Sequence, residues 1–290
     1  MVRGTFGSTR GRTYTAGNST LGVRRSAGRA SRSPLMGWLA RAGFTARGVM
    51  YVLIGIIALQ IAFGQHGHQA DRSGAVRLVA RNPFGHVALW LLVIGFAGMA
   101  LWRLSEAVYG AAGPDGHKAS TRLASLARAA FYGFVTYGIL QYALGIGAPQ
   151  SSNRQSRDLT AHAMKLPGGR IIVGLIGLAF VVAAARLAYH AYKKKFLRKL
   201  DLSSMNSTAY RAVVRLGQIG GIARGAVFAT VGIFIIVAAI DFRPHKAKGL
   251  DSALRALAHT PLGPWLLALV AAGLVTFGVY SFCEARWRRV

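Results

Sequence analysis

The chain has 290 residues, of which 53% are hydrophobic and only 15% are charged. A soluble domain of this length usually carries less apolar surface, so the composition favours a protein whose solvent is largely lipid. The formal net charge of +28 would suit a nucleic-acid-binding protein. However, the Lys and Arg lie almost entirely between long uncharged runs, a pattern typical of membrane topology signals. We therefore expect a lipid bilayer as partner and no nucleic acid.

Residues 1–34 contain seven Arg, no Lys and no acidic residue, together with many Ser, Thr and Gly. They hold no apolar run long enough for the core of a signal peptide. This composition predicts a disordered basic tail on the cytoplasmic side. An organellar transit peptide is the alternative, although its scattered glycines would weaken an amphipathic helix.

Six strongly apolar segments follow the tail, and each is a candidate transmembrane helix. A spanning helix needs ~20 apolar residues, and the shorter segments are extended at their ends by Arg side chains whose guanidinium groups reach the lipid headgroups. The segments are residues 48–64, 87–102, 129–147, 171–185, 225–240 and 265–283. The sequence therefore predicts an all-α protein with six transmembrane helices.

The distribution of Lys and Arg predicts the orientation. The tail and alternate loops carry 23 of the 36 Lys and Arg, whereas the opposite loops carry 11. By the positive-inside rule, the richer side is cytoplasmic, so both termini are expected in the cytoplasm. The basic run from Lys193 to Lys195, with Arg198 and Lys199, is the strongest element of this bias. It is also a candidate contact for anionic lipids.

The chain repeats itself three times, as residues 35–113, 114–200 and 201–290. The sequence ARAGFTARGVMY matches IGGIARGAVF and, more faintly, LASLARAAFY, which makes Arg47, Arg128 and Arg224 equivalent. Since each repeat contains two spans, all three enter the membrane in the same direction, and their pseudo-threefold axis is expected along the membrane normal. Each outer loop carries a short amphipathic helix, for which Asp71, Asp158 and Asp251 are candidate caps.

These repeats resemble a known bacterial family. The segments LARAGFTARGVMYVLIGIIALQIAFG, ADRSGAVRLVARNPFG and LWLLVIGFAGMALWRLSEAVYG are similar to the membrane family called domain of unknown function 1206. The likeness covers about residues 39–287 and is weaker in the middle unit, where Thr136 replaces the Gly found at positions 55 and 232. The resemblance implies three tandem two-helix units in a prokaryotic plasma membrane. It implies no known activity.

A set of charged residues lies at one end of the predicted spans. In the first unit, Arg103 and Glu106 share a helix face, and Arg47 is expected beside them on the other helix of the hairpin. In the sequence alignment, the middle unit has Arg186 and Tyr189 at these two positions, and the third has Ser281 and Glu284. The first interpretation is snorkelling and hairpin clamping; the second is an anion- or proton-linked site on the pseudo-threefold axis. The predicted cluster comprises Arg47, Arg103, Glu106, Arg128, Arg186, Arg224 and Glu284.

Motifs of other chemistries are weak or missing. His66, His68 and Asp71 have a spacing that could hold a metal, but a solvated loop is the ordinary explanation. The sequence has no HExxH, Gly-rich phosphate loop, nucleophile elbow or CxxC, so neither a cofactor nor an enzymatic activity is predicted. The single Cys283 excludes an internal disulfide and is expected to fill space in a helix, with palmitoylation as the alternative.

Three function classes follow from these features. The first is a non-enzymatic integral membrane protein that acts as a scaffold or partner for other membrane components, with other membrane proteins as possible partners. The alternative is a small-solute or ion transporter with a charged site near the axis, favoured by the repeats and the charges between the spans. A lipid-handling enzyme ranks third.

Overall fold

The computed structural model describes residues 34–65, 69–111, 116, 118–147, 150–258 and 262–289, and residues 257 and 258 by their backbone alone. Apart from Pro34, the predicted basic tail lies outside these residues. The six long helices are α2 (Pro34–Ala62), α4 (Gly85–Tyr109), α5 (Ala119–Ala143), α7 (Gly169–Tyr192), α8 (Ser207–Ile240) and α10 (Gly263–Trp287). All six are long and apolar enough to cross a membrane.

Each two-helix unit carries a short helix in its connecting loop. These helices are α3 (Arg72–Ala80), α6 (Ser152–Met164) and α9 (Leu250–Ala258). Single 3-10 turns, η1 (Lys195–Lys199), η2 (Leu202–Ser204) and η3 (Pro244–Lys246), lie in the loops around α8. The predicted all-α fold with six spanning helices in three tandem units is therefore confirmed, and the chain is a multi-pass membrane protein.

Helix α8 is much longer than the apolar run that predicts it. It begins at Ser207 because the Asn206 side chain accepts a hydrogen bond of 2.7 Å from the backbone N–H of Ala209 and caps the helix. Its first half is amphipathic, and Val213 and Gly217 are buried against neighbouring elements. Packing on one face thus extends the helix beyond the membrane-like segment.

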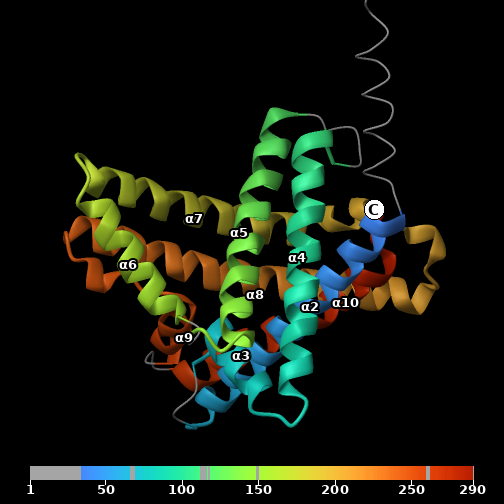
Figure 1. Ribbon diagram of the computed structural model, residues 1–290, viewed down its shortest axis with the longest axis horizontal. Helices are drawn as coiled ribbons and strands as arrows, with labels where there is room; N and C mark the ends of the chain where they lie inside the picture. Colours follow the sequence, from blue (N-terminus) through green and yellow to red (C-terminus); the bar gives the residue numbers. More distant parts are fainter. Residues whose placement is uncertain are drawn as a thin grey trace, which may run out of the picture.

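The long helices follow one another around an incomplete ring. The most extensive contacts join consecutive units, in the pairs α10 with α2, α4 with α5, and α7 with α8. The two helices of the first unit and those of the third unit also pack together, whereas α5 and α7 of the middle unit do not form such an interface. Figure 1 shows the reason: α4 and α5 run up the picture, and α7 and α8 run across it.

Small residues allow the close helix pairs. A Cβ on Gly48 of α2 would lie 3.0 Å from the Gly278 carbonyl oxygen of α10, and one on Gly232 of α8 would lie 3.0 Å from the Gly177 carbonyl oxygen of α7. Helix association in lipid depends on such close approach, because lipid chains are as apolar as the side chains themselves.

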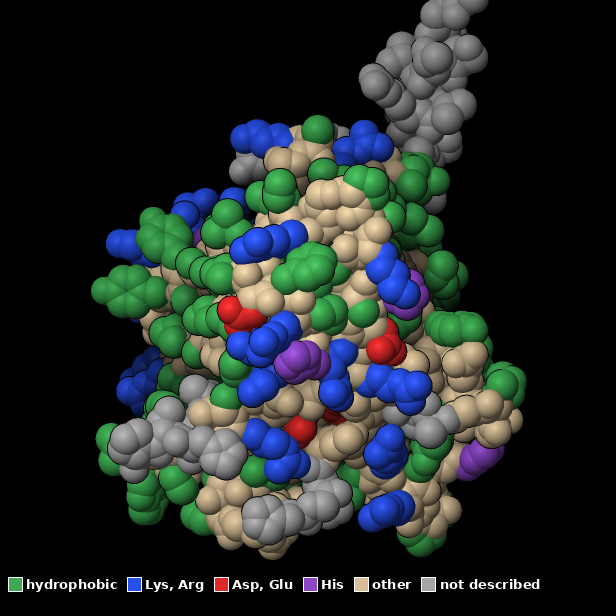
Figure 2. Space-filling view, turned by 90° about the vertical axis from the view of Figure 1, so that its left-hand side faces the viewer, with side chains coloured by type: hydrophobic (Ala, Val, Ile, Leu, Met, Phe, Trp, Pro, Cys, Tyr) green, Lys and Arg blue, Asp and Glu red, His purple; other side chains and the backbone are tan. Residues whose placement is uncertain are grey.

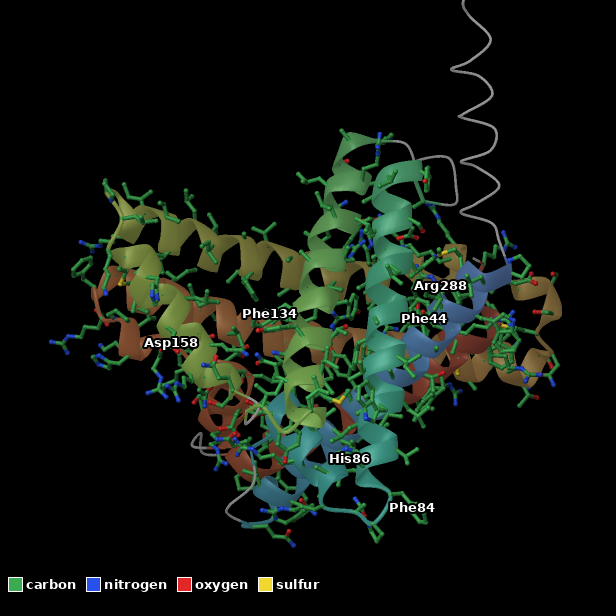
Figure 3. All side chains as sticks on the ribbon, viewed as in Figure 1. Phe44, Phe84, His86, Phe134, Asp158 and Arg288 are labelled. Atoms are coloured by element: carbon green, nitrogen blue, oxygen red, sulfur yellow. The ribbon has the colours of Figure 1, made fainter. Side chains whose placement is uncertain are left out.

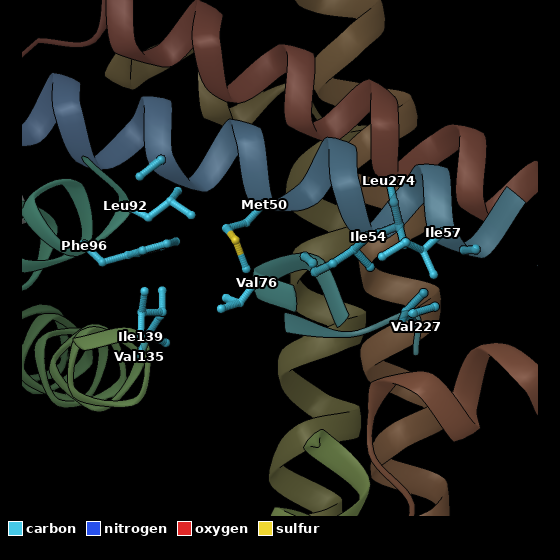
Figure 4. Close-up of a cluster of buried hydrophobic side chains, with 14 of the residues drawn as sticks. Met50, Ile54, Ile57, Val76, Leu92, Phe96, Val135, Ile139, Val227 and Leu274 are labelled. Carbon is cyan, nitrogen blue, oxygen red and sulfur yellow. The ribbon is translucent and has the colours of Figure 1, made fainter. Parts of the chain in front are cut away.

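The main hydrophobic core lies between units rather than inside one hairpin. In Figure 4, Ile54 and Ile57 of α2 lie near Leu274 of α10, while Phe96 of α4 lies near Ile139 of α5. The core thus joins helices from all three units and fixes their order around the ring.

The three short helices meet and close a cyclic set of hydrogen bonds. The Ala70 N–H donates to Asp251 at 2.9 Å, the Ser152 N–H donates to Asp71 at 2.7 Å, and the Gly249 N–H donates to the Asn153 side-chain oxygen at 2.9 Å. Each unit thus donates to an adjacent unit, as expected for pseudo-threefold symmetry. We call Asp71, Asn153 and Asp251 the cap ring.

The cap ring corrects the predicted role of Asp158. Asp71 caps α3 as expected, accepting from the Gly74 N–H at 3.0 Å. In the middle unit the cap is Ser151, and Asn153 takes the place of the aspartates. Asp158 instead lies within α6, exposed and far from the main core (Figure 3). The prediction is wrong because α6 begins at Ser152, six residues before Asp158.

Candidate functional site: a charged cluster between the units

Arg47 and Glu284 form a buried ion pair that joins the first unit to the third. The guanidinium of Arg47 contacts the Glu284 carboxylate, and its Nε donates to the Ser281 hydroxyl at 3.1 Å. Arg47 and Glu284 are only 7% and 6% exposed. The expected partner of Arg47, Glu106 in the same hairpin, is wrong because α2 packs more extensively on α10 than on α4.

Arg288 is a member of this cluster that the sequence analysis missed. It donates to the second oxygen of Glu284 at 2.5 Å, and its guanidinium lies 4.7 Å from the centre of the Phe44 ring. Figure 3 shows Arg288 beside Phe44. The signal was the i,i+4 spacing of Glu284 and Arg288. The basic run at the end of the chain had been assigned only to topology.

Arg103 and Glu106 form the second ion pair, at 2.7 Å, as their spacing predicts. The Ser125 hydroxyl of α5 donates to the same Glu106 oxygen at 3.3 Å. Arg128, one turn further along α5, lies within electrostatic range of Glu106, although its side chain is exposed. Arg128 and Glu106 thus take the positions of Arg47 and Glu284 one unit further around the ring, but the direct partner of Glu106 is Arg103.

The structure shifts the alignment of the middle unit by one residue. Helices α4, α7 and α10 begin at equivalent glycines, Gly85, Gly169 and Gly263, and continue without interruption. Gly48 packs on Gly278, and its equivalent Gly225 packs on Ala184, which confirms this register. One residue is a rotation of about 100° around a helix, so the correction moves side chains to another face.

In the corrected register, His190 is the equivalent of Glu106 and Glu284, and Leu187 is the equivalent of Arg103. Arg186 takes the place of Trp102 and is exposed on α7. The cluster therefore brings together six of the seven predicted residues and excludes Arg186. The pairing of Arg186 with Arg103 in the sequence alignment was wrong. It needs a one-residue gap between the start of α7 and Arg186, and α7 is continuous there.

Arg224 differs from its counterparts Arg47 and Arg128 because its neighbouring helix α7 offers no carboxylate. Its guanidinium carbon lies 4.9 Å from the centre of the Phe277 ring and 5.1 Å from that of Phe228. Its Nε is buried and has no hydrogen-bond partner. The rings compensate part of the charge through cation–π attraction, but they accept no N–H bond of ordinary strength.

Lys199 lies over the cluster, where the C-terminal residues pair with the loop after α7. The Arg289 N–H donates to the Lys199 carbonyl at 3.1 Å, and the Asp201 N–H donates to the Trp287 carbonyl at 2.7 Å. The side chain of Lys199 is exposed, but the surrounding chain removes part of its hydration, and this loss together with the neighbouring guanidinium of Arg288 lowers the pKa of Lys199 to about 8. Arg128 and Arg103 add to this lowering, so the charges around Lys199 are mainly positive.

The lowered pKa predicts how stability depends on pH. In the unfolded chain the Lys199 pKa returns towards 10.5, so between about pH 8 and 10.5 the unfolded state binds more protons than the folded state. We expect the stability of the wild type to rise with pH across this window. The measurement is thermal unfolding in detergent at several pH values. The Lys199→Met variant should lose this contribution, and an identical pH profile for both proteins would contradict it.

The cluster as a whole contains six cations and two carboxylates. The cations are Arg47, Arg103, Arg128, Lys199, Arg224 and Arg288. An excess of positive charge near a low-dielectric region stabilises anions and repels cations. The arrangement can therefore clamp helices together, as Glu284 does, and can also attract an anion.

The predicted metal position cannot be placed, because His66 and His68 lie outside the described residues. Among the residues that the structure does describe, no group of three or more His, Cys, Asp and Glu side chains could hold a metal ion. Cys283 is partly buried and packs beside a small core around Leu200 and Tyr280.

Comparison with known proteins gives the family. A family model described as Domain of Unknown Function (DUF1206) matches three segments of the chain, residues 42–110, 123–194 and 219–288. The chain belongs to the DUF1206 family. It is similar to another protein, Uncharacterized protein YxxB of Bacillus subtilis (strain 168), with 29% identity over 252 residues, which cover 86% of this chain and 90% of the relative. No solved structure matches this DUF1206 protein.

Proposed function

We propose that this DUF1206 protein is a non-enzymatic membrane scaffold that binds a transmembrane helix of another protein between α5 and α7. The supporting observation is that the middle unit leaves open an interface that the other two units fill. We call this surface the α5/α7 seam. It comprises Leu123, Ala127, Ala179, Val182 and Ala183, all of which are exposed.

The equivalents of the seam residues are in contact in the first unit. Ala46, Gly95 and Met99 are the equivalents of Ala127, Ala179 and Ala183, and all three are buried. Ala46 faces Gly95, and Met99 faces Gly43, which is the equivalent of Ala124 beside the seam. In the third unit, Gly220 faces Phe277 and Gly273 faces Ala223 in the same way. The faces of α5 and α7 that line the seam thus correspond to faces that pack against a transmembrane helix in the other two units. This likeness favours a helix as its occupant.

The test is photo-crosslinking in living cells that produce the full chain. A benzophenone amino acid at Ala127 or Val182 should yield a discrete adduct with one membrane protein, joined to a peptide from its transmembrane segment. Leu178 is the matched control on the same helix, because its equivalents Ile94 and Ala272 are also exposed. Adducts with lipid alone, a crosslink between α5 and α7, or the same protein adduct from Leu178 would each refute the docked helix.

Transport of a small anionic solute is the second candidate function. The excess of cations in the charged cluster favours it, whereas the mutual pairing of Arg47 with Glu284 and of Arg103 with Glu106 favours clamping. Reconstitution into liposomes with a panel of ions and metabolites distinguishes the two functions. Flux that is lost in Arg128→Gln would support transport over the scaffold.

We also propose a bacterial plasma membrane with both termini in the cytoplasm, on the basis of the family and the charge bias. Reporter fusions after Gln65, Gln150 and Arg243 are expected to report the outside, and fusions after Lys195 the cytoplasm. Figure 2 shows that the face around α6 also carries Lys and Arg. The two sides of the membrane therefore differ only in how many Lys and Arg they carry. An inverted pattern of reporter activity would refute this orientation.

A further inference from the structure

Three equivalent arginines, one from each unit, face the second helix of the neighbouring unit. Arg47 meets Glu284, and Arg128 lies near Glu106, but the third position opposite Arg224 holds His190. Arg224 is half-buried, and its buried Nε has no hydrogen-bond partner, which costs free energy unless another acceptor is present. The third position is therefore the place where the cluster lacks an anion.

A second orphaned donor lies in the same cluster. Arg103 is 6% exposed, and its Nε has no hydrogen-bond partner, although its Nη1 donates to Glu106. Arg103 and Arg224 both lie within electrostatic range of the Tyr132 side chain, as does Arg47. The unpaired donors of two units thus converge on one region between the units.

Two cations of the cluster lie at its exposed edge. Arg128 and Lys199 are exposed, and both lie within electrostatic range of Arg288. An anion that approaches this edge of the cluster therefore meets Arg128 and Lys199 first.

We propose that the charged cluster binds a phosphate group, with Arg103, Arg128 and Arg224 as its ligands and Lys199 at its entrance. A phosphate group offers several strong acceptor oxygens and up to two negative charges, which match a cluster with six cations and two carboxylates. Guanidinium groups bind such oxygens with two parallel N–H bonds. The group could belong to inorganic phosphate or to the headgroup of an anionic lipid, because both present the same oxygens. None of the proposed phosphate ligands is a residue of the α5/α7 seam. The phosphate site can therefore be refuted without refuting the scaffold, and the reverse.

The test measures binding to the purified full chain in a neutral detergent. The probes are inorganic phosphate, dioctanoyl phosphatidylglycerol and dioctanoylglycerol, which lacks the phosphate. Binding is followed by calorimetry and by the shift in the midpoint of thermal unfolding. Sodium chloride at matched ionic strength controls for simple screening of the cations.

Arg128→Gln and Arg224→Gln are expected to weaken binding by about tenfold or more each, because each removes charge-assisted hydrogen bonds. Arg211→Gln is the control, since Arg211 is exposed near the start of the same helix as Arg224. It should bind as the wild type does. Arg128 is exposed, so its variant is expected to fold even if the Arg224 variant does not.

Binding of both phosphate and phosphatidylglycerol would support a site for the free ion, and binding of the lipid alone would support a headgroup site. The proposal is wrong if neither probe binds or if dioctanoylglycerol binds equally well. It is also wrong if sodium chloride gives the same stabilisation, or if Arg128→Gln binds with wild-type affinity.

Discussion

Replacement of Glu284 by Gln is expected to cost the folded protein about 3 kcal/mol or more of stability, which is the usual effect of breaking a buried ion pair by removing one partner. The effect should be large because Glu284 binds two arginines, Arg47 from the first unit and Arg288 from the end of the chain. Both would stay buried without a carboxylate. The measurement is the loss of helical circular dichroism on heating or with added denaturant in detergent.

Asp201→Asn is the matched control for Glu284→Gln. Asp201 also faces an arginine, Arg289, but the pair is 3.8 Å apart and both side chains are largely exposed. Such pairs contribute roughly 0–1 kcal/mol, so this variant should unfold nearly as the wild type does. Equal effects of the two substitutions would show that the buried pair does not join the first unit to the third.

Replacement of Asp71 by Ala is the second change with a large expected effect. Asp71 is fully buried and accepts hydrogen bonds from the Ser152 N–H at 2.7 Å and from the Gly74 N–H at 3.0 Å. Alanine leaves both amides without this acceptor, at a cost of about 1–3 kcal/mol each. We expect a loss of about 2 kcal/mol or more in the same unfolding assay, together with looser contact between α3 and α6.

The chain offers two controls for Asp71→Ala. Asp71→Asn keeps one acceptor oxygen but replaces the other by an NH2 group, which cannot accept a hydrogen bond, so it should lose less stability than Asp71→Ala without being neutral. Asp158→Ala removes an exposed acid from α6 and should be nearly neutral. A neutral Asp71→Ala variant would mean that the cap ring does not hold the units together.

The sequence was sufficient to predict the six spans and three units, because apolar runs and repeated motifs are local features. Asp71 was also predictable as a cap, since it directly precedes the helix that it caps. The partners of Arg47 were not predictable, because the choice between Glu106 and Glu284 depends on which helices pack most closely. That choice is made by contacts such as Gly48 with Gly278, which lie far apart in the chain.

The middle unit was the hardest to predict. Its sequence tolerates two alignments that differ by one residue. The continuity of α7 and the packing of Gly225 on Ala184 show that His190, rather than Tyr189, takes the position of Glu106. The opening between α5 and α7 was also not predictable, because Ala127, Ala179 and Val182 are as apolar as residues in a packed interface. Burial depends on the directions of whole helices, which no local pattern records.

Crosslinking of paired cysteines tests the open seam most directly. In a Cys283→Ser background, the pairs Ala46/Met99, Ala127/Ala183 and Ala223/Phe277 occupy equivalent positions in the three units, and each is replaced by two cysteines. Mild oxidation with iodine, a reagent much smaller than a bis-maleimide, is expected to join the first and third pairs by a disulfide within one chain and to leave the middle pair unjoined. Equally efficient crosslinking of all three pairs would show that α5 and α7 pack together, and would contradict both the open ring and the helix-binding seam.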